Sequence, residues 1–384
     1  MGTTDFARRW RSRAQYLWSQ GTDSRVIATR TWLENRVLPW SAVTSDAGPD
    51  APTIAYAGPA HGIVKIHQML EKRREALGAV TTSRVQGRAD RETLLRGDVL
   101  PDADLVAVAG SAAQIARLPR DSALTLPFRL HILASTEDGG DGWRRRMSKS
   151  ERRCALAFQR TGAWALEVAG DAASLDWFYH RMHVPTMRSR HGARARSESL
   201  DYARECLFRK GMLAFVTRDG ERVAGMLCRW EPGTGILSVR LVGVLDGLAE
   251  LYEDGAMRVS DHLILEWASA NGVRQVDFGG CEPFLSLGTL QWKRKVGPMG
   301  ELAPNHLGSL RVWWHARRDT PAVRDFLAAN PVVEMTAGGG LRAVYFQDDR
   351  RPARLDLAAT REGIDGHRVV ELDEYFAGVM APAR

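Results

Sequence analysis

The chain has 384 residues, of which 44% are hydrophobic and 26% charged, with 36 glycines and 16 prolines. This composition excludes a disordered, collagen-like or coiled-coil protein, and the length predicts two packed units rather than one small module. Lysine and arginine number 53 against 46 aspartates and glutamates, and the net charge of +7 favours anionic partners such as phosphates, nucleotides or RNA. Six of these cations are lysines, so the charge is mostly guanidinium, a bias that GC-rich coding would also produce.

The N-terminal third of the chain predicts a helix followed by an α/β unit. Residues 5–20 place aromatic and leucine side chains at helical spacing among arginines, which indicates a basic amphipathic helix. A surface helix is favoured over an RNA-contacting arm. Short apolar runs at 53–57 and 105–109 predict strands, with a helix at 64–77 between them. We expect a first domain over residues 1–142.

A loop rich in glycine and aspartate at 135–143 is expected at the domain boundary. The segment after it predicts a basic helix. Its cations repeat at i, i+4, i+7 and i+8, which would put them on one helix face: Arg145, Lys149, Arg152 and Arg153. These cations are candidates for binding phosphates or an RNA backbone, and the alternative is a solvated helix face.

Residues 143–300 predict a second domain with the element order β-α-α-β-β-β-α-β. Strands are expected at 164–170, 236–245 and 274–280, and helices at 174–190, 200–210 and 257–270. A hairpin is expected at 212–230, with its turn at Asp219-Gly220. An antiparallel meander followed by a crossover helix and a parallel strand excludes the P-loop and Rossmann folds. Residues 301–384 predict strands at 308–314 and 342–347 and a helix after Pro321, and we expect them to pack back on the other units.

The cysteine and histidine spacings predict neither disulfides nor a metal site. The cysteines are scattered without a C-x-x-C pair, and His180 and His183 lack a matching carboxylate pattern. Nowhere does an uncharged apolar run reach 18 residues, and no apolar segment follows the basic N-terminal residues. We therefore expect a cytoplasmic protein with no membrane span.

The most specific motif begins at the end of the last strand of the second domain and reads DFGGCEPFLSLGTLQWKRKVGP. The element order is similar to the Gcn5-related N-acetyltransferase (GNAT) fold, and this motif resembles the Fem family of tandem-GNAT aminoacyltransferases. The matching residues are Asp277, Phe278, Gly279, Gly288, Trp292, Lys293 and Gly297. The upstream segments MSKSERRCALAFQRTG and FYHRMHVPTMRSRHG resemble the linker helix of that family and the first helix of its second domain.

The resemblance, which covers residues 143–300, implies two tandem GNAT-like domains of the α/β (α+β) class joined by the basic helix. It implies transfer of an aminoacyl group from aminoacyl-tRNA to the amine of a small metabolite or a peptidoglycan precursor. The basic helix would contact the tRNA, and no cofactor would be bound permanently. Acyl-CoA is the donor of many GNAT relatives, so an acyl-CoA-dependent N-acyltransferase is an alternative. A non-catalytic RNA- or nucleotide-binding protein on a GNAT scaffold is a second one.

Acyl transfer to an amine requires a cation or N–H groups where the oxyanion develops. The Fem pattern implies this role for Lys293, and the neighbouring Arg294 and Lys295 are candidates for holding donor phosphates. The alternative is a solvated strand in which Lys293 and Lys295 share one face and Arg294 points away. Asp277 can accept the amine proton, or it can only fix the turn through an Asx hydrogen bond.

Further substrate contacts are expected from the turn and from the helix at 174–190. Gly279 and Gly280 allow a close approach of substrate to the backbone, or simply a sharp turn. Trp292 belongs to the same motif and is a candidate substrate contact. Tyr179 and His183 lie at i and i+4 on the helix that borders the acceptor pocket in GNAT folds, and a histidine there can act as a base.

The segment between the strand at 236–245 and the next helix argues against acyl-CoA. GNAT enzymes that bind acetyl-CoA grip its pyrophosphate there with an Arg/Gln-x-x-Gly-x-Gly/Ala loop at a helix N-terminus. In this chain the segment is VLDGLAELYEDGAMRVSD, which lacks that loop and contains Asp246, Glu250, Glu253 and Asp254. This departure favours a donor that is held elsewhere.

Overall fold

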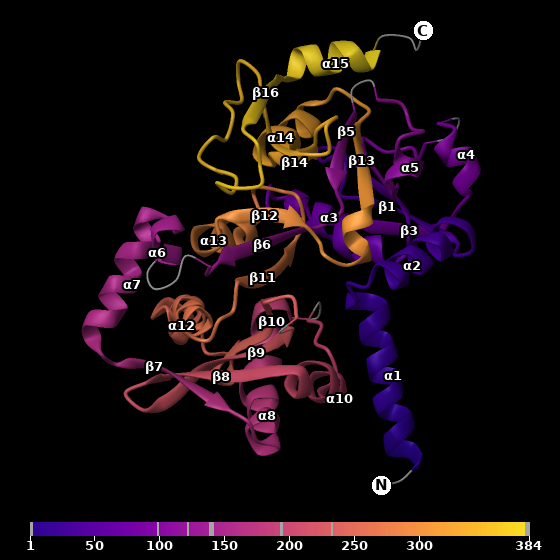
Figure 1. The fold of residues 1–384 in the computed structure, drawn as a ribbon. Coiled ribbons are helices and arrows are strands. Elements are labelled where there is room, and N and C mark those ends of the chain that lie inside the picture. Colours follow the sequence, from indigo (N-terminus) through magenta and orange to yellow (C-terminus); the bar gives the residue numbers. More distant parts are fainter. Residues whose placement is uncertain are drawn as a thin grey trace. The chain divides into compact units, whose positions relative to one another are not determined.

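A computed structural model describes residues 3–97, 100–120, 123–137, 142–192, 195–231 and 233–380 (Figure 1). Residues 138–141 of the loop expected at 135–143 lie outside the described residues. The chain divides into two compact units. The first unit consists of residues 1–20, 131–279 and 292–299, and the second of residues 21–130, 280–291 and 300–384.

These units are discontinuous in sequence and differ from the contiguous segments expected at 1–142, 143–300 and 301–384. The N-terminal helix α1 (Thr3–Gln20) and strand β6 (Leu130–Ser135) are the main reason. Tyr16 of α1 packs into the core of the first unit, and β6 lies next to β11 (Gln275–Cys281) in its sheet. Long-range strand pairing therefore groups segments that local composition separates.

The sheet of the first unit has an antiparallel meander that ends in a parallel pair, as expected for this part of the chain. Its order is β12-β6-β11-β10-β9-β8-β7. The strands not yet named are β7 (Trp164–Ala169), β8 (Gly211–Arg218), β9 (Glu221–Glu231), β10 (Ile236–Val244) and β12 (Met299–Leu302). The predicted hairpin turn is confirmed, since Asp219 and Gly220 between β8 and β9 both have positive φ, at 52° and 87°.

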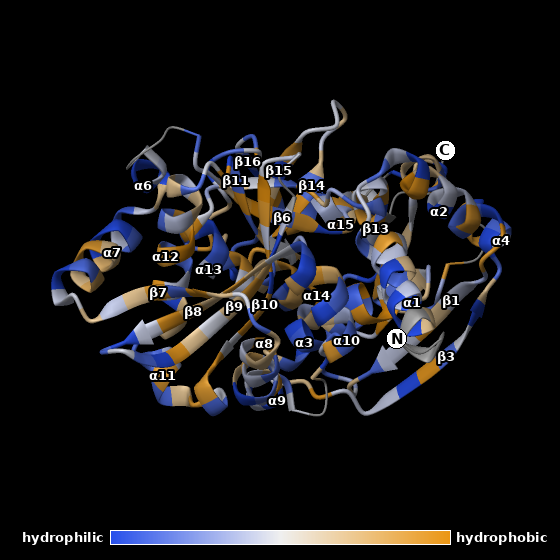
Figure 2. Cartoon of the chain, turned by 60° about the horizontal axis from the view of Figure 1, so that its bottom comes forward, coloured by the Kyte–Doolittle hydropathy of each residue, from blue (hydrophilic) through white to orange (hydrophobic). Residues whose placement is uncertain are grey.

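Helices cover both faces of this sheet, because its central strands are hydrophobic on both sides (Figure 2). In β8, Met212 and Ala214 pack with α12 (Ala256–Ala270), whereas Leu213 and Phe215 pack with α8 (Ala172–Phe178) on the other face. The remaining helices are α6 (Gly142–Arg146), α7 (Lys149–Thr161), η2 (Tyr179–His183), α9 (Val184–His191), α10 (Leu200–Tyr202), η4 (Ala203–Leu207), η5 (Phe208–Lys210), η6 (Leu245–Gly247), α11 (Ala249–Glu253) and α13 (Gly288–Val296).

The second unit contains a mixed sheet in the order β3-β1-β2-β4-β13-β5. Its strands are β1 (Trp40–Asp46), β2 (Ile54–Gly58), β3 (Ser83–Ala89), β4 (Leu105–Ser111), β5 (Ala123–Pro127) and β13 (Leu310–Ala316). The predicted strands β2 and β4 pair in parallel, and β13 of the C-terminal segment inserts between β4 and β5. Its helices are α2 (Ser24–Arg36), η1 (Ile63–His67), α3 (Gln68–Glu75), α4 (Arg91–Leu95), α5 (Ala112–Ile115) and η7 (His306–Ser309).

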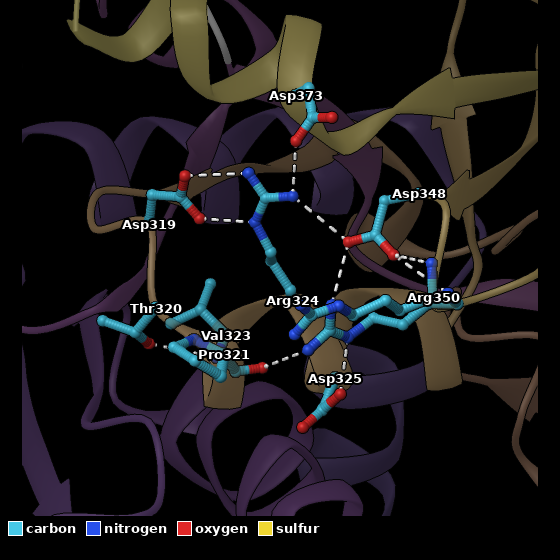
Figure 3. A network of polar contacts seen from close by, with 10 residues as sticks. Asp319, Thr320, Pro321, Val323, Arg324, Asp325, Asp348, Arg350 and Asp373 are labelled. Atoms are coloured by element: carbon cyan, nitrogen blue, oxygen red, sulfur yellow. Dashed lines mark hydrogen bonds and ion pairs between the residues drawn. The ribbon is translucent and has the colours of Figure 1, made fainter.

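A smaller sheet of the second unit, β14 (Val332–Met335), β15 (Leu341–Gln347) and β16 (His367–Glu371), is joined to α14 (Pro321–Ala329) and α15 (Leu372–Met380) by an ionic network. Figure 3 shows Arg324 of α14 at its centre. Its guanidinium donates to Asp319 at 2.6 and 2.8 Å, to Asp348 at 3.1 Å and to Asp373 at 2.6 Å. A guanidinium has several N–H donors and can bind three carboxylates at once, so the role of this cluster is structural: it holds these elements together.

Candidate active site

Asp277 lies in β11 at the point where its pairing with β10 stops. The parallel register covers residues 236–238 and 275–277, and a bulge near Arg240 bends β10 just beyond it. Asp277 is buried, and its two oxygens accept hydrogen bonds from His131 Nδ1 at 2.8 Å and from the Gly279 N–H at 2.7 Å. Burial raises the pKa of Asp277, but His131, the Gly279 N–H and the charge of Lys293 outweigh it and lower the pKa below the usual value.

The hydrogen bond to Gly279 supports the Asx turn among the alternatives for Asp277, and the bond to His131 adds a partner that no sequence motif indicated. His131 is 6% exposed and lies on β6, remote from Asp277 in sequence. With Asp277 ionised, Nδ1 of His131 carries the proton of this hydrogen bond. An aspartate that orients a histidine in this way is a common arrangement for a general base.

Lys293 extends from α13 to the same turn. Its ammonium donates to the Gly279 carbonyl at 3.0 Å, and its charge favours the ionised forms of both Asp277 and Asp261. The alternative of a strand for the WKRK segment is wrong, because residues 288–296 are helical and Gly297 donates to the Lys293 carbonyl at 2.7 Å. Lys293 is thus a half-buried cation between two buried carboxyl groups.

Asp261 is a second functional candidate that the sequence analysis did not single out. It is 2% exposed on α12, and its Oδ2 has no hydrogen-bond partner among the described residues. Burial and the charge of Glu151 raise the pKa of Asp261 well above its usual value, although Lys293 and the indole N–H of Trp292 favour the carboxylate. The signal available in the sequence for Asp261 was a carboxylate on the apolar face of the helix predicted at 257–270. Trp292, predicted to touch substrate, here donates to Asp261.

Gly279 is required for its backbone conformation rather than for space. Its φ is +79°, whereas an added Cβ would make only ordinary contacts at 3.7 Å with Lys293 Nζ and the Val239 carbonyl. Gly280 differs, because a Cβ there would lie 2.1 Å from Nε of Arg129, whose guanidinium donates to the Gly280 carbonyl at 2.8 Å. The packing against Arg129 accounts for Gly280, and substrate contact by either glycine stays a prediction.

Gly279→Ala is expected to destabilise the protein by about 1–2 kcal/mol, the usual cost of a left-handed conformation for a residue with a side chain. Gly170→Ala is the matched control, because Gly170 has neither a positive φ nor an atom within 4 Å of an added Cβ. Chemical denaturation of both variants measures the difference. Equal stabilities of the two variants would contradict the conformational requirement at Gly279.

Tyr179 and His183 both lie in the π-helical turn η2 and already have protein partners. The Tyr179 hydroxyl donates to the Glu198 carbonyl at 2.7 Å, and His183 is buried with Nδ1 2.9 Å from the Val242 carbonyl. Burial lowers the pKa of His183, so the ring is neutral. Its Nε2 has no hydrogen-bond partner among the described residues. A role of these two side chains in binding the acceptor stays a prediction.

The basic segment does not form one continuous helix. Ser148 has an extended backbone, with ψ of 149°, and caps α7 by accepting from the Glu151 N–H at 3.2 Å. Arg145 therefore lies on α6 and Lys149 on α7, and the expectation that they share one helix face is wrong. Arg145, Lys149 and Arg153 are exposed, and Arg152 is half-buried.

The start of α7 nevertheless lies beside the end of α13. The Ser148 N–H donates to the Lys295 carbonyl at 3.1 Å, which places the backbones of Lys149 and Lys295 close together. Arg294 and Lys295 are both half-buried. The cations of α7 and those of α13 therefore lie on two chain segments that meet at Lys295, two residues beyond Lys293.

The connection between β10 and α12 is occupied by η6 and α11, and two of its acids are engaged. Asp246 accepts two hydrogen bonds of 2.7 Å from Arg181, and Asp254 accepts one of 2.7 Å from Arg218. The Phe158 ring covers Gly255 at the start of α12, 3.1 Å from where a Cβ would be. The N-terminus of α12 thus combines nearby carboxylates with an aromatic cover, a poor setting for a pyrophosphate.

The topology, the motif and the local geometry agree with a comparison to protein families. Residues 144–294 match the family described as "Acetyltransferase (GNAT) domain". The chain carries a GNAT-type acyltransferase domain. The α/β fold class predicted from the sequence is confirmed, and Lys293, Asp277, Asp261 and Trp292 all lie within the matched range. No curated protein matches the sequence significantly.

Solved structures with a similar chain course have low identities. They include the C-terminal domain of a protein assigned as lysylphosphatidylglycerol synthetase from Agrobacterium fabrum, with 10% identity, a TM-score of 0.38, and coverage of 81% of this chain and 91% of that one. L-PGS from Bacillus licheniformis has 10% identity and a TM-score of 0.34, and the match covers 82% of this chain and 94% of that one. A GCN5-related N-acetyltransferase from Kribbella flavida has 11% identity and a TM-score of 0.26, and the match covers 92% of this chain and 78% of that one. Likeness at this level says nothing about activity.

Among the described residues, none of the helices combines the length with the apolar composition that crossing a membrane requires.

Proposed function

We propose that the GNAT-type domain forms an amide bond by transferring an aminoacyl group from aminoacyl-tRNA to an amine. The observation that carries the proposal is the position of Lys293, whose ammonium is anchored at the Gly279 carbonyl beside the Asp277–His131 pair. An ammonium held at this position places a positive charge beside the turn, where it can stabilise a developing oxyanion.

In the proposed reaction the amine nitrogen attacks the ester carbonyl and the tetrahedral oxyanion forms near Lys293. The amine proton passes to Nε2 of His131, whose imidazolium is stabilised by Asp277. Collapse of the intermediate breaks the ester C–O bond, and the proton leaves with the ribose hydroxyl of the tRNA. Asp277 is 5% exposed and bound to Nδ1 of His131, so it is assigned as a positioning residue for His131 rather than as the base.

Two features support aminoacyl-tRNA over acyl-CoA as the donor. The connection where GNAT enzymes hold pyrophosphate here contains α11, the acids Asp246 and Asp254, and the cover of Phe158 over Gly255. The meeting of α7 with α13 brings exposed cations close to the end of the helix that carries Lys293. A polyanionic donor gains from such cations through phosphate contacts. The acceptor is an amine of a small metabolite or a peptidoglycan precursor, and the expected location is the cytoplasm.

A transfer assay tests the proposal. The full chain is incubated with a mixed pool of charged tRNA and an amine pool, with and without ribonuclease, and in parallel with labelled acetyl-CoA. Ribonuclease-sensitive transfer is expected. Transfer from acetyl-CoA alone would contradict the proposed donor and favour the acyl-CoA-dependent alternative. Binding of RNA without transfer from either donor would favour the non-catalytic alternative.

The cations at the start of α7 are expected to contribute to tRNA affinity. In the double variant Lys149→Ala/Arg153→Ala, affinity should fall to a similar extent for all tRNA species, because phosphate contacts carry no sequence information. The slope of log K against log salt should decrease by about two, one for each lost phosphate contact. The control is Arg160→Ala, an exposed cation in the last turn of the same helix. Equal effects of both changes would contradict a localised tRNA contact.

A further inference from the structure

A cluster of two histidines and a glutamate lies in the second unit. Glu34 lies in α2, His61 precedes η1, and His306 begins η7. Oε1 of Glu34 is 3.4 Å from Nε2 of His306 and 3.9 Å from Nδ1 of His61. One potential ligand atom from each residue lies within 4.8 Å of the other two. Three segments remote in sequence thus direct nitrogen and oxygen donors at a common point.

The polar atoms of this cluster are buried without adequate partners. Glu34 is 5% and His306 is 3% exposed, while the side chain of His61 is 25% exposed. Among the described residues, Oε2 of Glu34, Nε2 of His61 and Nδ1 of His306 have no hydrogen-bond partner, whereas Nε2 of His306 faces Oε1 of Glu34 at 3.4 Å. A buried polar atom without a partner costs about 1–3 kcal/mol, so several such atoms at one point indicate a missing ligand.

The surroundings hold the donors in place and partly shield them from solvent. Nε of Arg30 donates to Oε1 of Glu34 at 2.9 Å, one helical turn away in α2, which fixes the carboxylate. The His61 ring packs against Phe128 and His306, with ring centroids 5.3 and 5.4 Å away. These contacts resemble the outer shell that orients ligands in metal sites, where the ligating carboxylate is itself hydrogen-bonded.

Arg30 and Lys65 place positive charge near the same three side chains and oppose the binding of a further cation.

We propose that Glu34, His61 and His306 bind a divalent transition-metal ion of the zinc class. Zinc bonds of about 2.0–2.1 Å in a tetrahedron place the ligand atoms about 3.4 Å apart. The separation of Glu34 Oε1 and His306 Nε2 already has this value, and Glu34 Oε1 lies 3.9 Å from His61 Nδ1. Two histidines and a glutamate leave the fourth position to water or another ligand. The spacing of these residues in the sequence carries no metal signature, which explains why none was predicted.

Metal binding by the full chain tests this inference. The purified protein is stripped with a chelator, and the binding of Zn²⁺ is measured by calorimetry and by metal content after desalting. One equivalent of zinc and a rise in melting temperature are expected. Substitution of Co²⁺ should give the intense visible absorption of a four-coordinate site. No stoichiometric binding of Zn²⁺ or Co²⁺ would overturn the proposal.

Variants separate this site from adventitious binding. His306→Gln and His61→Asn are each expected to weaken Zn²⁺ binding at least 10- to 100-fold. His367→Gln, at an exposed position of β16 in the same unit, should bind like the unaltered protein. His61 is partly exposed, so His61→Asn provides the test if His306→Gln does not fold. Unchanged affinity in a folded His61→Asn or His306→Gln variant would overturn the assignment.

Discussion

Lys293→Met is expected to lower the rate of acyl transfer about 100- to 1000-fold, the usual loss when one preorganised oxyanion donor is removed. Methionine has a similar length and no charge, so the developing oxyanion loses its cation. The affinity for the donor should change much less, because Lys293 is assigned to the transition state rather than to phosphate binding. Single-turnover kinetics with a saturating donor measures the effect separately from binding.

Lys295→Met is the matched control, since it removes the same charge from the same helix two residues later. It should retain the single-turnover rate and weaken only the affinity for the donor. Removal of Lys293 also leaves Asp261 and Asp277 without their shared cation, so a lower stability is expected as well. Lys293→Arg keeps a positive charge and serves if Lys293→Met does not fold. A folded Lys293→Met variant with the unaltered single-turnover rate would contradict the assigned role.

Glu151→Gln is expected to destabilise the protein by about 3 kcal/mol at pH 7 and to make its stability less dependent on acid. Glu151 of α7 is fully buried and accepts hydrogen bonds of 2.6 and 2.8 Å from Arg258 of α12. His262 Nε2 lies 3.2 Å from the same carboxylate. Burial raises the pKa of Glu151, but the hydrogen bonds from His262 and Arg258 outweigh it and lower the pKa to about 2.

The sign of the pH dependence follows from this shift. Between pH 4.5 and about 2 the unfolded chain binds a proton at Glu151 and the folded protein does not, so folding weakens as the pH falls through this window. The contribution is complete above pH 4.5 and amounts to about 3 kcal/mol at 1.36 kcal/mol per pKa unit. A glutamine cannot titrate, so the variant loses this part of the acid sensitivity.

Denaturant unfolding at pH 7 and at pH 3.5 measures both effects. Glu253→Gln, at an exposed position of α11, is the control and should behave like the unaltered protein. Glu151 holds α7 against α12, so Glu151→Gln should also reduce tRNA affinity. The reduction should be smaller than that of the double change of Lys149 and Arg153, which removes the cations themselves. A stability of Glu151→Gln equal to that of Glu253→Gln at pH 7 would contradict the buried ion pair.

The local elements of the GNAT-type domain were predictable because their signals are short-range. The apolar run of β8, the Asp219-Gly220 turn and the apolar stripe of α12 each depend on residues within a few positions of one another. The break between α6 and α7 was missed because Ser148 caps a helix in a segment whose charges suggest continuity. A serine followed three residues later by a glutamate was the available signal.

The sequence by itself determined the element order over residues 164–280 and the motif that places Asp277, Gly279 and Lys293 in one stretch of chain. Only the tertiary structure decided which residues complete that motif. His131 reaches Asp277 because β6 joins the sheet beside β11, and Asp261 meets Trp292 because α12 packs near α13. The cluster of Glu34, His61 and His306 likewise forms from three remote segments. Such contacts follow from strand pairing and helix packing over long sequence separations, and no local periodicity encodes them.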